Sequence, residues 1–234
     1  MNKYSIENNC SYCLGMSLTI EALKHKSNYI KKVILSSKAH KNEQLSYLLD
    51  LCKQNNIVPI YDDEVISKLS IKENCYCIGE FSKFYTDLLS NKHIVLYGFN
   101  DFGELGTILR SSISFDFRDI VLIDSNIDYF DPRCIRASMG SIFLCNIVKF
   151  DSIDEYIKSY PNQKIVPFIS KSNSELKQLK LSDNYSLLIP QNYYDLDDKY
   201  KNGYYLKHLN LSEISLSVRS SIILNYAYNQ NRNR

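Results

Sequence analysis

The stretch NDFGELGTILRSS, Asn100–Ser112, decides how this chain is best interpreted. It follows the apolar run HIVLYGF and places Gly103 and Gly106 between a predicted strand and a predicted helix. Glycines in such a turn let the backbone approach a bound phosphate. Their spacing, however, is neither the dinucleotide fingerprint nor the phosphate loop. What the turn holds therefore has to be inferred from the rest of the chain.

Length and composition leave room for one large core or two small ones, because the chain has 234 residues and a hydrophobic content of 44%. The seven cysteines are an odd number and no stretch has the features of an export signal, so we expect reduced thiols. No apolar run is long enough to cross a bilayer. These features predict a soluble cytoplasmic protein that makes no use of a membrane.

The net charge of +2 conceals a basic segment. From Lys24 to Lys41 the chain has six lysines and two histidines, and no acidic residue. Two interpretations stay open: a surface that binds a polyanion, or a solvated face in a lysine-rich chain. All the arginines, which suit fork-like binding of phosphate, lie at or after Arg110.

Two alternating patterns predict two α/β domains. In the first, the helical spacing of MSLTIEALKH and NEQLSYLLDLCKQNN alternates with the strand-like runs YIKKVILSS, IVPIYD and CYCIGEF. In the second, the strand-like runs HIVLYGF, DIVLIDS, SIFLCNIVKF, KIVPFIS and SLLIP alternate with helical stretches at 104–114, 151–159 and 173–179. That alternation is typical of a parallel sheet covered by helices. We expect domains at 1–82 and 93–234, joined by a linker at 83–92 with a helical pattern.

The C-terminal segment EISLSVRSSIILNYAY predicts the clearest helix, which starts after Ser212 as a cap. Its apolar residues form one wide stripe, made of Ile214, Val218, Ile222 and Tyr226 and flanked by Leu216, Ile223 and Ala227. A stripe of this width can serve both a core and a contact between two copies. The polar tail NQNRNR is expected to fray.

Three separated segments together resemble one family. NDFGELGTILRSS is similar to the first motif of the SpoU (TrmH) class of SPOUT RNA methyltransferases, roughly Asp-Pro-x-Asn-x-Gly-x-x-x-Arg. IRASMGSIF, Ile135–Phe143, resembles the family's Ala-Ser-x-Gly segment, and ISLSVRSSIILNY, Ile214–Tyr226, resembles its closing Ser-Leu-Asn-Val-Ser helix. LGMSLTIEALK is similar to the start of the L30e-like substrate-binding domain that precedes the catalytic domain in many members.

The resemblance implies a fold, a reaction and an assembly. The implied fold is α/β, with an L30e-like N-terminal domain followed by a SPOUT parallel-sheet domain that ends in a trefoil knot. Proteins of this family transfer a methyl group from S-adenosylmethionine to a ribose 2'-hydroxyl of ribosomal or transfer RNA, and they act as homodimers. RNA, S-adenosylmethionine and a second copy are thus the expected partners.

The resemblance also implies the site residues. The catalytic positions are Arg110, Glu104 and Ser215, and the cofactor would contact Ser138, Leu188, Ile189, Pro190, Leu209, Leu216 and Ser217. Independently of the resemblance, the basic segment predicts that RNA contacts Lys24, Lys26, Lys31 and Lys32. A 2'-hydroxyl is a poor nucleophile, so it has to be held in line with the sulfonium while its developing charge is stabilised. We expect Arg110 to contact the target ribose-phosphate.

Several positions depart from the family pattern. Glu104 stands where the first motif has asparagine, Pro190 and Asn192 stand where the second has glycine and glutamate, and Ser217 replaces the asparagine of the closing helix. Two hypotheses follow. The chain is either a divergent methyltransferase in which Glu104 takes over a polar function, or a catalytically inactive RNA-binding homologue that keeps the SPOUT fold.

No metal site is predicted. Cys10-x-x-Cys13 and Cys75-x-Cys77 have spacings that occur in zinc sites. The second pair, however, lies in an apolar strand, where alternate residues face opposite sides. Small buried thiols explain both pairs equally well. Among the histidines, His208 is of interest because it falls on a proposed knot loop.

Overall fold

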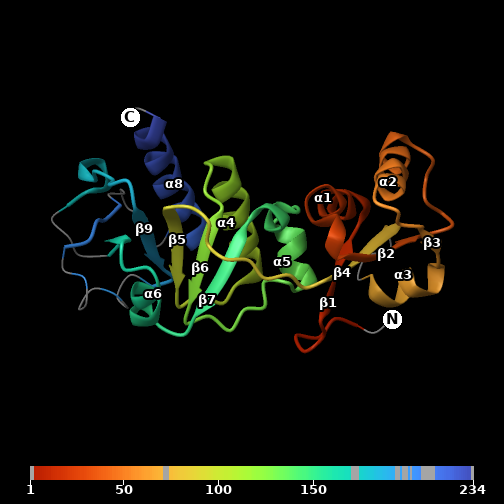
Figure 1. Cartoon of the computed structure of the whole chain (residues 1–234), viewed down its shortest axis with the longest axis horizontal. Coiled ribbons are helices and arrows are strands. Elements are labelled where there is room, and N and C mark those ends of the chain that lie inside the picture. Colours follow the sequence, from red (N-terminus) through yellow and green to blue (C-terminus); the bar gives the residue numbers. More distant parts are fainter. Residues whose placement is uncertain are drawn as a thin grey trace. The chain divides into compact units, whose positions relative to one another are not determined.

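The chain forms two compact units, shown in Figure 1. This computed structural model describes residues 3–70, 74–169, 174–192, 196, 200, 202–206 and 214–232. The first unit consists of Met1–Phe84 and Asp128–Leu144, and the second of Tyr85–Ile127 and Cys145–Arg234. No single position in the sequence therefore separates the two units, because the segment 128–144 returns to the first unit.

The first unit contains a four-stranded sheet with the strand order β1-β4-β2-β3. β4 pairs antiparallel with β1 and β2, whereas β3 pairs parallel with β2. Its elements are β1 (Cys10–Leu14), α1 (Met16–Lys26), the short 3-10 helix η1 (Ser27–Tyr29), β2 (Ile30–Leu35), α2 (Glu43–Gln54), β3 (Ile60–Tyr61), α3 (Asp63–Leu69), β4 (Cys77–Ser82), α5 (Pro132–Ala137) and the 3-10 helix η2 (Ser141–Leu144).

Local sequence explains where the helices of this unit begin. Asn42 caps α2, since its Oδ1 accepts from the Leu45 amide at 2.9 Å, and Asp62 caps α3 by accepting from the Val65 amide at 2.9 Å. Sequence reasoning predicted α1, α2, β2 and β4 and missed β1, α3 and α5. It also extended β3, which has only two residues.

A buried ion pair holds the returning segment in the first unit. The Lys83 ammonium lies 2.8 Å from Asp128 Oδ2, and the side chains of both residues are mostly buried. The Tyr4 hydroxyl also donates to this carboxylate. Next to the pair, the rings of Phe81 and Phe84 contact those of Phe130 and Phe143, with centroids 5.0–6.2 Å apart. Paired charge and aromatic packing thus fix 128–144 against strand β4.

The second unit contains a five-stranded sheet with the order β7-β6-β5-β9-β8, and all its pairs are parallel. This confirms the parallel sheet predicted from the alternating pattern. Its elements are β5 (Lys92–Tyr97), α4 (Phe102–Ser114), β6 (Asp119–Ile123), β7 (Asn146–Phe150), α6 (Ile153–Ser159), β8 (Lys164–Pro167), the 3-10 helix η3 (Leu176–Gln178), β9 (Tyr185–Pro190) and α8 (Leu216–Arg232).

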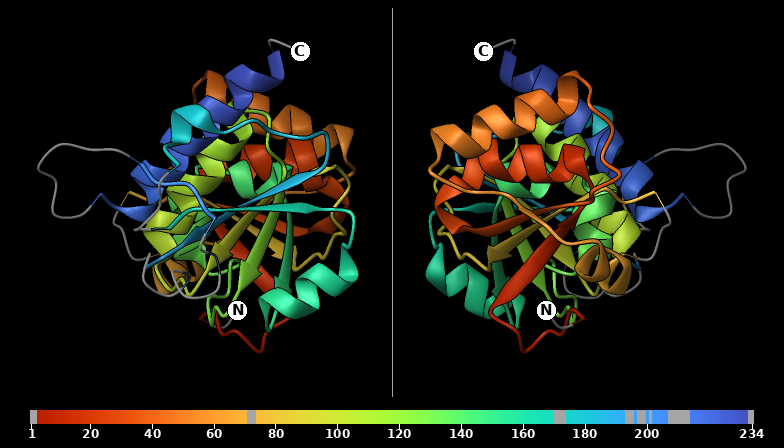
Figure 2. Two further views of the ribbon diagram at one scale, coloured as in Figure 1. Left: turned by 90° about the vertical axis from the view of Figure 1, so that its left-hand side faces the viewer. Right: turned by 90° about the vertical axis from the view of Figure 1, so that its right-hand side faces the viewer.

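Helices cover both faces of this sheet, as Figure 2 shows. Val95, Val121 and Leu188 pack with Ile153 and Tyr156 of α6. The alternate strand residues point to the opposite face, where α4 and α8 lie side by side (Figures 1 and 2). Within the described residues, no helix combines the length and the apolar character needed to span a bilayer.

Four predictions about local structure are wrong. The segment 83–91 is not helical, because the amides of Leu89 and Ser90 donate to the Asp119 carboxylate at 3.1 and 2.6 Å. The predicted strand 141–150 is divided into η2 and β7. The predicted helix at 173–179 is a single 3-10 turn within its described part, and the polar tail is helical as far as Arg232.

A chain of polar groups is buried in the second unit. The fully buried His93 has Nδ1 2.7 Å from the Tyr156 hydroxyl, which in turn lies 2.6 Å from Ser186 Oγ. Its Nε2 lies 2.9 Å from the Ser90 carbonyl oxygen, so this nitrogen carries the proton. Burial lowers the pKa of His93 from its ordinary value of 6.5.

The buried His93 predicts how stability depends on pH. Because its pKa is lower in the folded than in the unfolded protein, the unfolded chain binds more protons below pH 6.5, and the free energy of unfolding falls as the pH is lowered through that range. We expect His93→Gln to lose about 1–3 kcal/mol at pH 8 with its hydrogen bonds, and to show a flatter pH dependence in urea titrations. Replacement of the more exposed His25 by Gln is the control, and an unchanged slope in His93→Gln would contradict the assignment.

Candidate active site at the carboxyl edge of the parallel sheet

The order of the strands points to one place on the sheet. From β5 the chain proceeds through β6 to β7 on one side, whereas β9 and β8 lie on the other side of β5. The topological switch point is therefore between β5 and β9. In open α/β sheets, ligands bind outside the carboxyl ends of the strands at such a point.

Main-chain pairing brings the ends of three strands to one level. Tyr97 of β5 is in register with Ile123 of β6 and with Pro190 of β9. Beyond the strands, the Gly98 amide donates to the Ile123 carbonyl at 3.0 Å, and the Gln191 amide donates to the Tyr97 carbonyl at 2.8 Å. The three following loops therefore leave the sheet from a common, rigid base.

Side chains connect the first two of these loops. Ser125 Oγ donates to the Phe99 carbonyl at 2.6 Å, and the Asn126 amide donates to Asn100 Oδ1 at 3.2 Å. Asp124 is exposed and has a φ of 51°, a conformation that costs energy for a residue other than glycine. Sequence reasoning missed this polar group, although a run of polar residues directly after a buried strand could have indicated it.

The glycine-containing turn that opens the motif serves the start of α4. Asp101 caps this helix by accepting from the Glu104 amide at 2.7 Å. A methyl group on Gly103 would lie 3.2 Å from the capping oxygen, so glycine gives the cap its room. Gly106 is buried inside the helix. The main role of this turn is thus to allow a tight connection between strand β5 and helix α4.

Glu104 and Arg110 leave α4 in different directions. Six residues separate them, which at about 100° per residue places them roughly 120° apart around the helix. Arg110 is exposed and shares an exposed stripe with Gly103, Thr107 and Ser114, whereas Glu104 is half-buried in the first turn. The structure brings both to one helix without placing them in contact.

The predicted cofactor residues of β9 are part of the sheet. Leu188 is buried against α6, and Ile189 and Pro190 are also buried. The side chains of Leu188 and Ile189 belong to the core, so a ligand at this strand would meet its main chain and the residues that follow. Leu209 and His208 lie outside the described residues.

A buried arginine connects α8 to the end of β9. Arg219 is 4% exposed, and its Nη2 donates to the Gln191 carbonyl at 2.7 Å. A buried guanidinium has to be hydrogen-bonded, since taking a charge out of water costs several kcal/mol. Arg219 therefore fixes the loop after Pro190 to the first turns of α8. Sequence reasoning missed it, because Arg219 stands within an apolar helical pattern.

Three of the predicted site residues, Ser215, Leu216 and Ser217, lie at the start of α8. The Val218 amide donates to Ser215 Oγ at 3.4 Å, and Ser215 Oγ lies 3.1 Å from Ser217 Oγ. Ser215 thus acts as a cap for the helix. Leu216 is buried, 1% exposed. Ser217 lines the groove described next.

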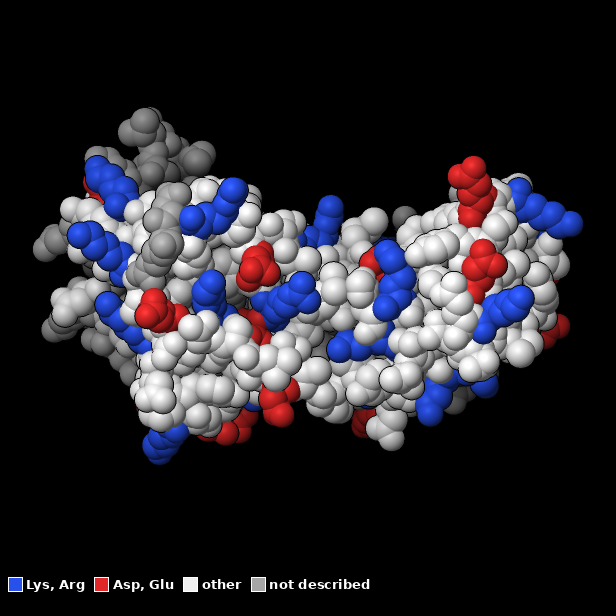
Figure 3. Space-filling view, turned by 45° about the horizontal axis from the view of Figure 1, so that its top comes forward, with Lys and Arg blue, Asp and Glu red and all other residues white. Residues whose placement is uncertain are grey.

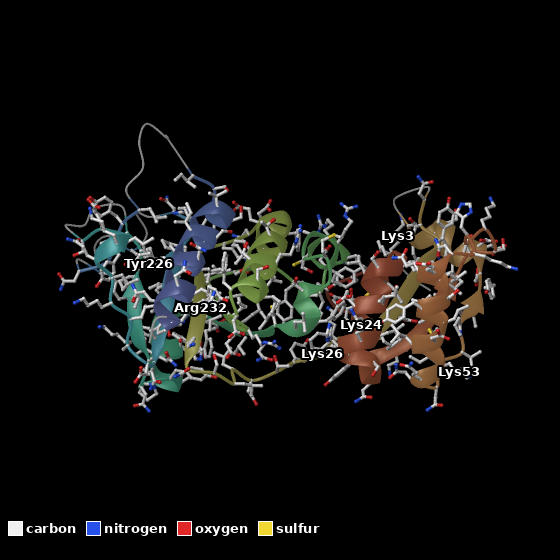
Figure 4. All side chains as sticks on the ribbon, turned by 90° about the horizontal axis from the view of Figure 1, so that it is seen from above. Lys3, Lys24, Lys26, Lys53, Tyr226 and Arg232 are labelled. Carbon is white, nitrogen blue, oxygen red and sulfur yellow. The ribbon has the colours of Figure 1, made fainter. Side chains whose placement is uncertain are left out.

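A groove of about 360 Å³ runs along α4 and α8. Its lining is mainly apolar and consists of Thr107, Ser217, Val218, Ser221, Ile222 and Asn225. Val218 and Ile222 are 49% and 42% exposed. The predicted stripe through these residues is therefore not the core face, which instead contains Leu216, Arg219, Ser220, Ile223, Leu224 and Ala227. Tyr226, labelled in Figure 4, donates from its hydroxyl to the Lys177 carbonyl at 2.8 Å.

The remaining predicted residues belong to the first unit. Ser138 is fully buried, and its hydroxyl donates to the Ile135 carbonyl at 2.8 Å. Lys24 forms an ion pair with Glu21 at 2.9 Å, and the Lys26 ammonium lies 4.9 Å from the centre of the Phe84 ring. Lys31 and Lys32 are exposed. Figure 3 shows Lys and Arg interspersed with Asp and Glu over the visible face of each unit.

The cysteine pairs are packed as thiols. Cys13 and Cys77 are fully buried, and burial raises the pKa of Cys77 to about 12 and also raises that of Cys13. Zinc requires thiolates, which this environment disfavours. Across the part of the chain that the structure describes, no group of three or more metal-ligating side chains is present.

Comparison with known proteins finds relatives of this chain. Residues 91–189, which contain the motif turn and β5–β9, match the SpoU rRNA Methylase family. A 23S rRNA (adenosine(1067)-2'-O)-methyltransferase of Streptomyces azureus is 28% identical over 151 residues, which cover 61% of this chain and 52% of that protein. The chain thus spans about half the length of this curated relative.

Solved structures share the whole architecture. An rRNA methyltransferase from Sinorhizobium meliloti has a TM-score of 0.75 at 20% identity, covering 95% of this chain and 88% of that one. The SpoU methyltransferase AviRb from Streptomyces viridochromogenes has a TM-score of 0.80 at 12% identity, covering 97% and 91%. At such identities the likeness concerns the fold. The chain is therefore similar to the SpoU rRNA Methylase family over residues 91–189, and it has the fold of the SpoU methyltransferases.

Proposed function

We propose that this protein is an S-adenosylmethionine-dependent RNA methyltransferase that modifies a ribose 2'-hydroxyl, with ribosomal RNA as its substrate. The observation that carries the proposal is the joined carboxyl edge of β5, β6 and β9 in the region that is similar to the SpoU family, with Arg110 on the helix that follows β5. The names of the Streptomyces azureus and Sinorhizobium meliloti proteins support ribosomal RNA. An AdoMet-bound structure of the latter supports the cofactor.

The residues at this edge fit the cofactor. Asn100, Asp124 and Asn126 offer polar groups after β5 and β6 along this edge, and the Arg219–Gln191 hydrogen bond holds the loop after β9 in place. Bound there, S-adenosylmethionine supplies an electrophilic methyl group. We assign Ser217, Leu216 and the main chain around Pro190 to its binding.

Residues of this chain must deprotonate the 2'-hydroxyl and stabilise the charge on its oxygen. During methylation the 2'-hydroxyl would have to give up its proton, and negative charge would develop on its oxygen. An exposed guanidinium such as Arg110 stabilises that charge and binds the neighbouring phosphate. Glu104 is the carboxylate of the same helix that can accept the proton.

The proposal also covers the domains, the knot, the cellular location and the oligomeric state. We propose that the first unit is an L30e-like RNA-binding domain, that the segment after β9 forms the trefoil knot, and that the enzyme works in the cytoplasm, where ribosomal RNA is found. We also propose a homodimer through the α4–α8 groove. Val218 and Ile222 are apolar and exposed there, and an apolar, non-acidic face of two helices suits a second copy of itself.

Cofactor binding is the first test. In calorimetric titrations we expect S-adenosylhomocysteine to bind the wild-type protein. We expect Arg219→Gln to bind it about 10-fold to 100-fold more weakly, since hydrogen bonds to charged groups contribute about 1.5–3 kcal/mol. Arg232→Gln, at the exposed end of α8, is the matched control. No heat from a folded wild-type protein would favour the inactive RNA-binding homologue.

Arg110 is tested by methyl transfer. Arg110→Ala should lower transfer to ribosomal RNA at least about 100-fold, the size expected for losing one preorganised stabilising group, while the affinity for S-adenosylhomocysteine stays unchanged. Arg118→Ala, an exposed arginine of the same unit, should keep full transfer. Equal activity in both variants would remove Arg110 from the mechanism.

The groove predicts an oligomeric state. The double variant Val218→Asp and Ile222→Asp should sediment as a monomer in analytical ultracentrifugation, because it places charges in an apolar contact. The exposed Leu89, replaced by Asp, serves as control and should leave a dimer. A dimer that persists in the double variant would place the contact elsewhere.

A further inference from the structure

A further groove lies at the amino ends of the parallel strands, at the opposite edge of the sheet from the candidate active site. It has a volume of about 540 Å³, and all the residues that line it belong to the second unit. Asn91 precedes β5, Gln163 precedes β8 and Asn184 precedes β9, so the starts of three neighbouring strands form one wall. The groove shares no residue with those assigned above to the cofactor, the RNA or the contact between two copies.

Main-chain hydrogen bonds hold this wall in place. The Tyr185 amide donates to the Asn91 carbonyl at 3.0 Å, and the Lys164 amide donates to the Asn184 carbonyl at 3.3 Å. The pairing of β5, β9 and β8 thus continues to the residues that precede these strands. The side chains of Asn91, Gln163 and Asn184 therefore start from positions that the sheet sets.

Four carboxamides meet at the groove, those of Asn91, Asn162, Gln163 and Asn184. The three asparagines are exposed, and Gln163 is half-buried. Among the described residues, the only hydrogen-bond partner of these four side chains is Ser186 Oγ, which lies 3.2 Å from Gln163 Oε1. Most of the donors and acceptors of these amides are thus available to a ligand.

The buried polar chain of the second unit anchors two parts of the groove. Ser186 Oγ, next to Gln163, lies 2.6 Å from the Tyr156 hydroxyl, which bonds to His93. His93 in turn donates to the carbonyl of Ser90, which also lines the groove. Gln163 and Ser90 are thus connected through buried, hydrogen-bonded groups, which limits their movement. Preorganisation of this kind lowers the entropy cost of binding a ligand.

Flat and aliphatic surface completes the groove. Tyr160 is half-buried, and its ring contacts that of His93 edge-on, with centroids 5.1 Å apart. Leu89, which also lines the groove, is 79% exposed. None of the described residues that line the groove is a lysine, arginine, aspartate or glutamate. A planar base can stack on the tyrosine, whereas a charged ligand would meet no opposite charge.

We propose that this groove binds the adenine ring of an uncharged nucleoside, at a site separate from that of the cofactor. In nucleic-acid recognition, asparagine and glutamine bind the N6/N7 edge of adenine through two hydrogen bonds, whereas guanine is bound mainly by arginine or lysine, which the lining lacks. The ring stacks on Tyr160, and the remaining amides bond to the ribose. S-adenosylmethionine does not suit the groove, since its ammonium, carboxylate and sulfonium need charged partners. The site goes beyond the proposed function and does not depend on it.

The test follows adenosine binding by NMR while S-adenosylhomocysteine is present in excess. This second ligand occupies the cofactor site, so adenosine has to bind elsewhere. We expect the side-chain amide signals of Asn91, Gln163 and Asn184 in the isotope-labelled, full-length protein to shift in one saturable process. No shift at these amides with millimolar adenosine, or shifts confined to other residues, would overturn the site.

Related ligands test the chemistry of the groove. Guanosine should bind about 10-fold more weakly than adenosine, since a carboxamide matches the edge of adenine and not that of guanine. Adenosine 5'-monophosphate should bind no more tightly than adenosine, because no cation lines the groove. Equal affinities for the two nucleosides, or tighter binding of the monophosphate, would contradict the proposal.

Substitutions at two amides locate the site. Asn91→Ala with Asn184→Ala should weaken adenosine binding at least about 10-fold, because hydrogen bonds from two side chains are lost. Both positions have a negative φ, which alanine adopts without strain. Asn9→Ala with Asn28→Ala, at two exposed asparagines of the first unit, is the matched control. If the two double variants bind adenosine equally well, the proposal is wrong.

The same variants separate this site from the enzymatic proposal. Asn91→Ala with Asn184→Ala should keep the wild-type affinity for S-adenosylhomocysteine and the wild-type rate of methyl transfer. A folded double variant that loses both ligands would make the groove part of the cofactor site and reject the proposal. If the wild-type protein binds no S-adenosylhomocysteine, the proposed function fails, whereas adenosine-induced shifts at the three amides would still support the groove.

Discussion

Hydrogen bonding between β5 and its two neighbours is the constraint on which the candidate site depends. Because Tyr97 is in register with both Ile123 and Pro190, the chain segments that follow three strands start from the same level. Two further main-chain bonds, from Gly98 to Ile123 and from Gln191 to Tyr97, continue this alignment into the loops. A ligand at this edge would meet groups whose positions are set by the sheet, which is the kind of preorganisation that catalysis requires.

The same constraint explains how Pro190 is tolerated at a position where the family pattern has glycine. Proline lacks an amide hydrogen and normally weakens an interior strand. Here it is the last residue of β9, and the ladder resumes at once, since Gln191 donates to Tyr97. The Gln191 carbonyl is then bound by Arg219. Hydrogen bonds thus hold this loop in one conformation without a glycine. Proline at position 190 is therefore compatible with a bound cofactor.

Periodic segments of the sequence predicted most of the second unit, because parallel strands buried on both faces are long apolar runs and α4 has a clear amphipathic pattern. The failures share a physical reason. The 83–91 segment has a helical pattern, but its amides find a better partner in the buried Asp119 carboxylate. Likewise, 128–144 joins the first unit through Lys83 and a group of phenylalanine rings that are distant in sequence. Such tertiary pairings leave no local signal.

The residues of the candidate site show the same contrast: local sequence indicates some of them, and others depend on tertiary contacts. The motif indicated Arg110 as a candidate, because its spacing from Asp101 is local. Arg219 was not found, since its burial depends on a carbonyl supplied by β9, and Asp124 was not found, since a positive φ is a property of the folded turn.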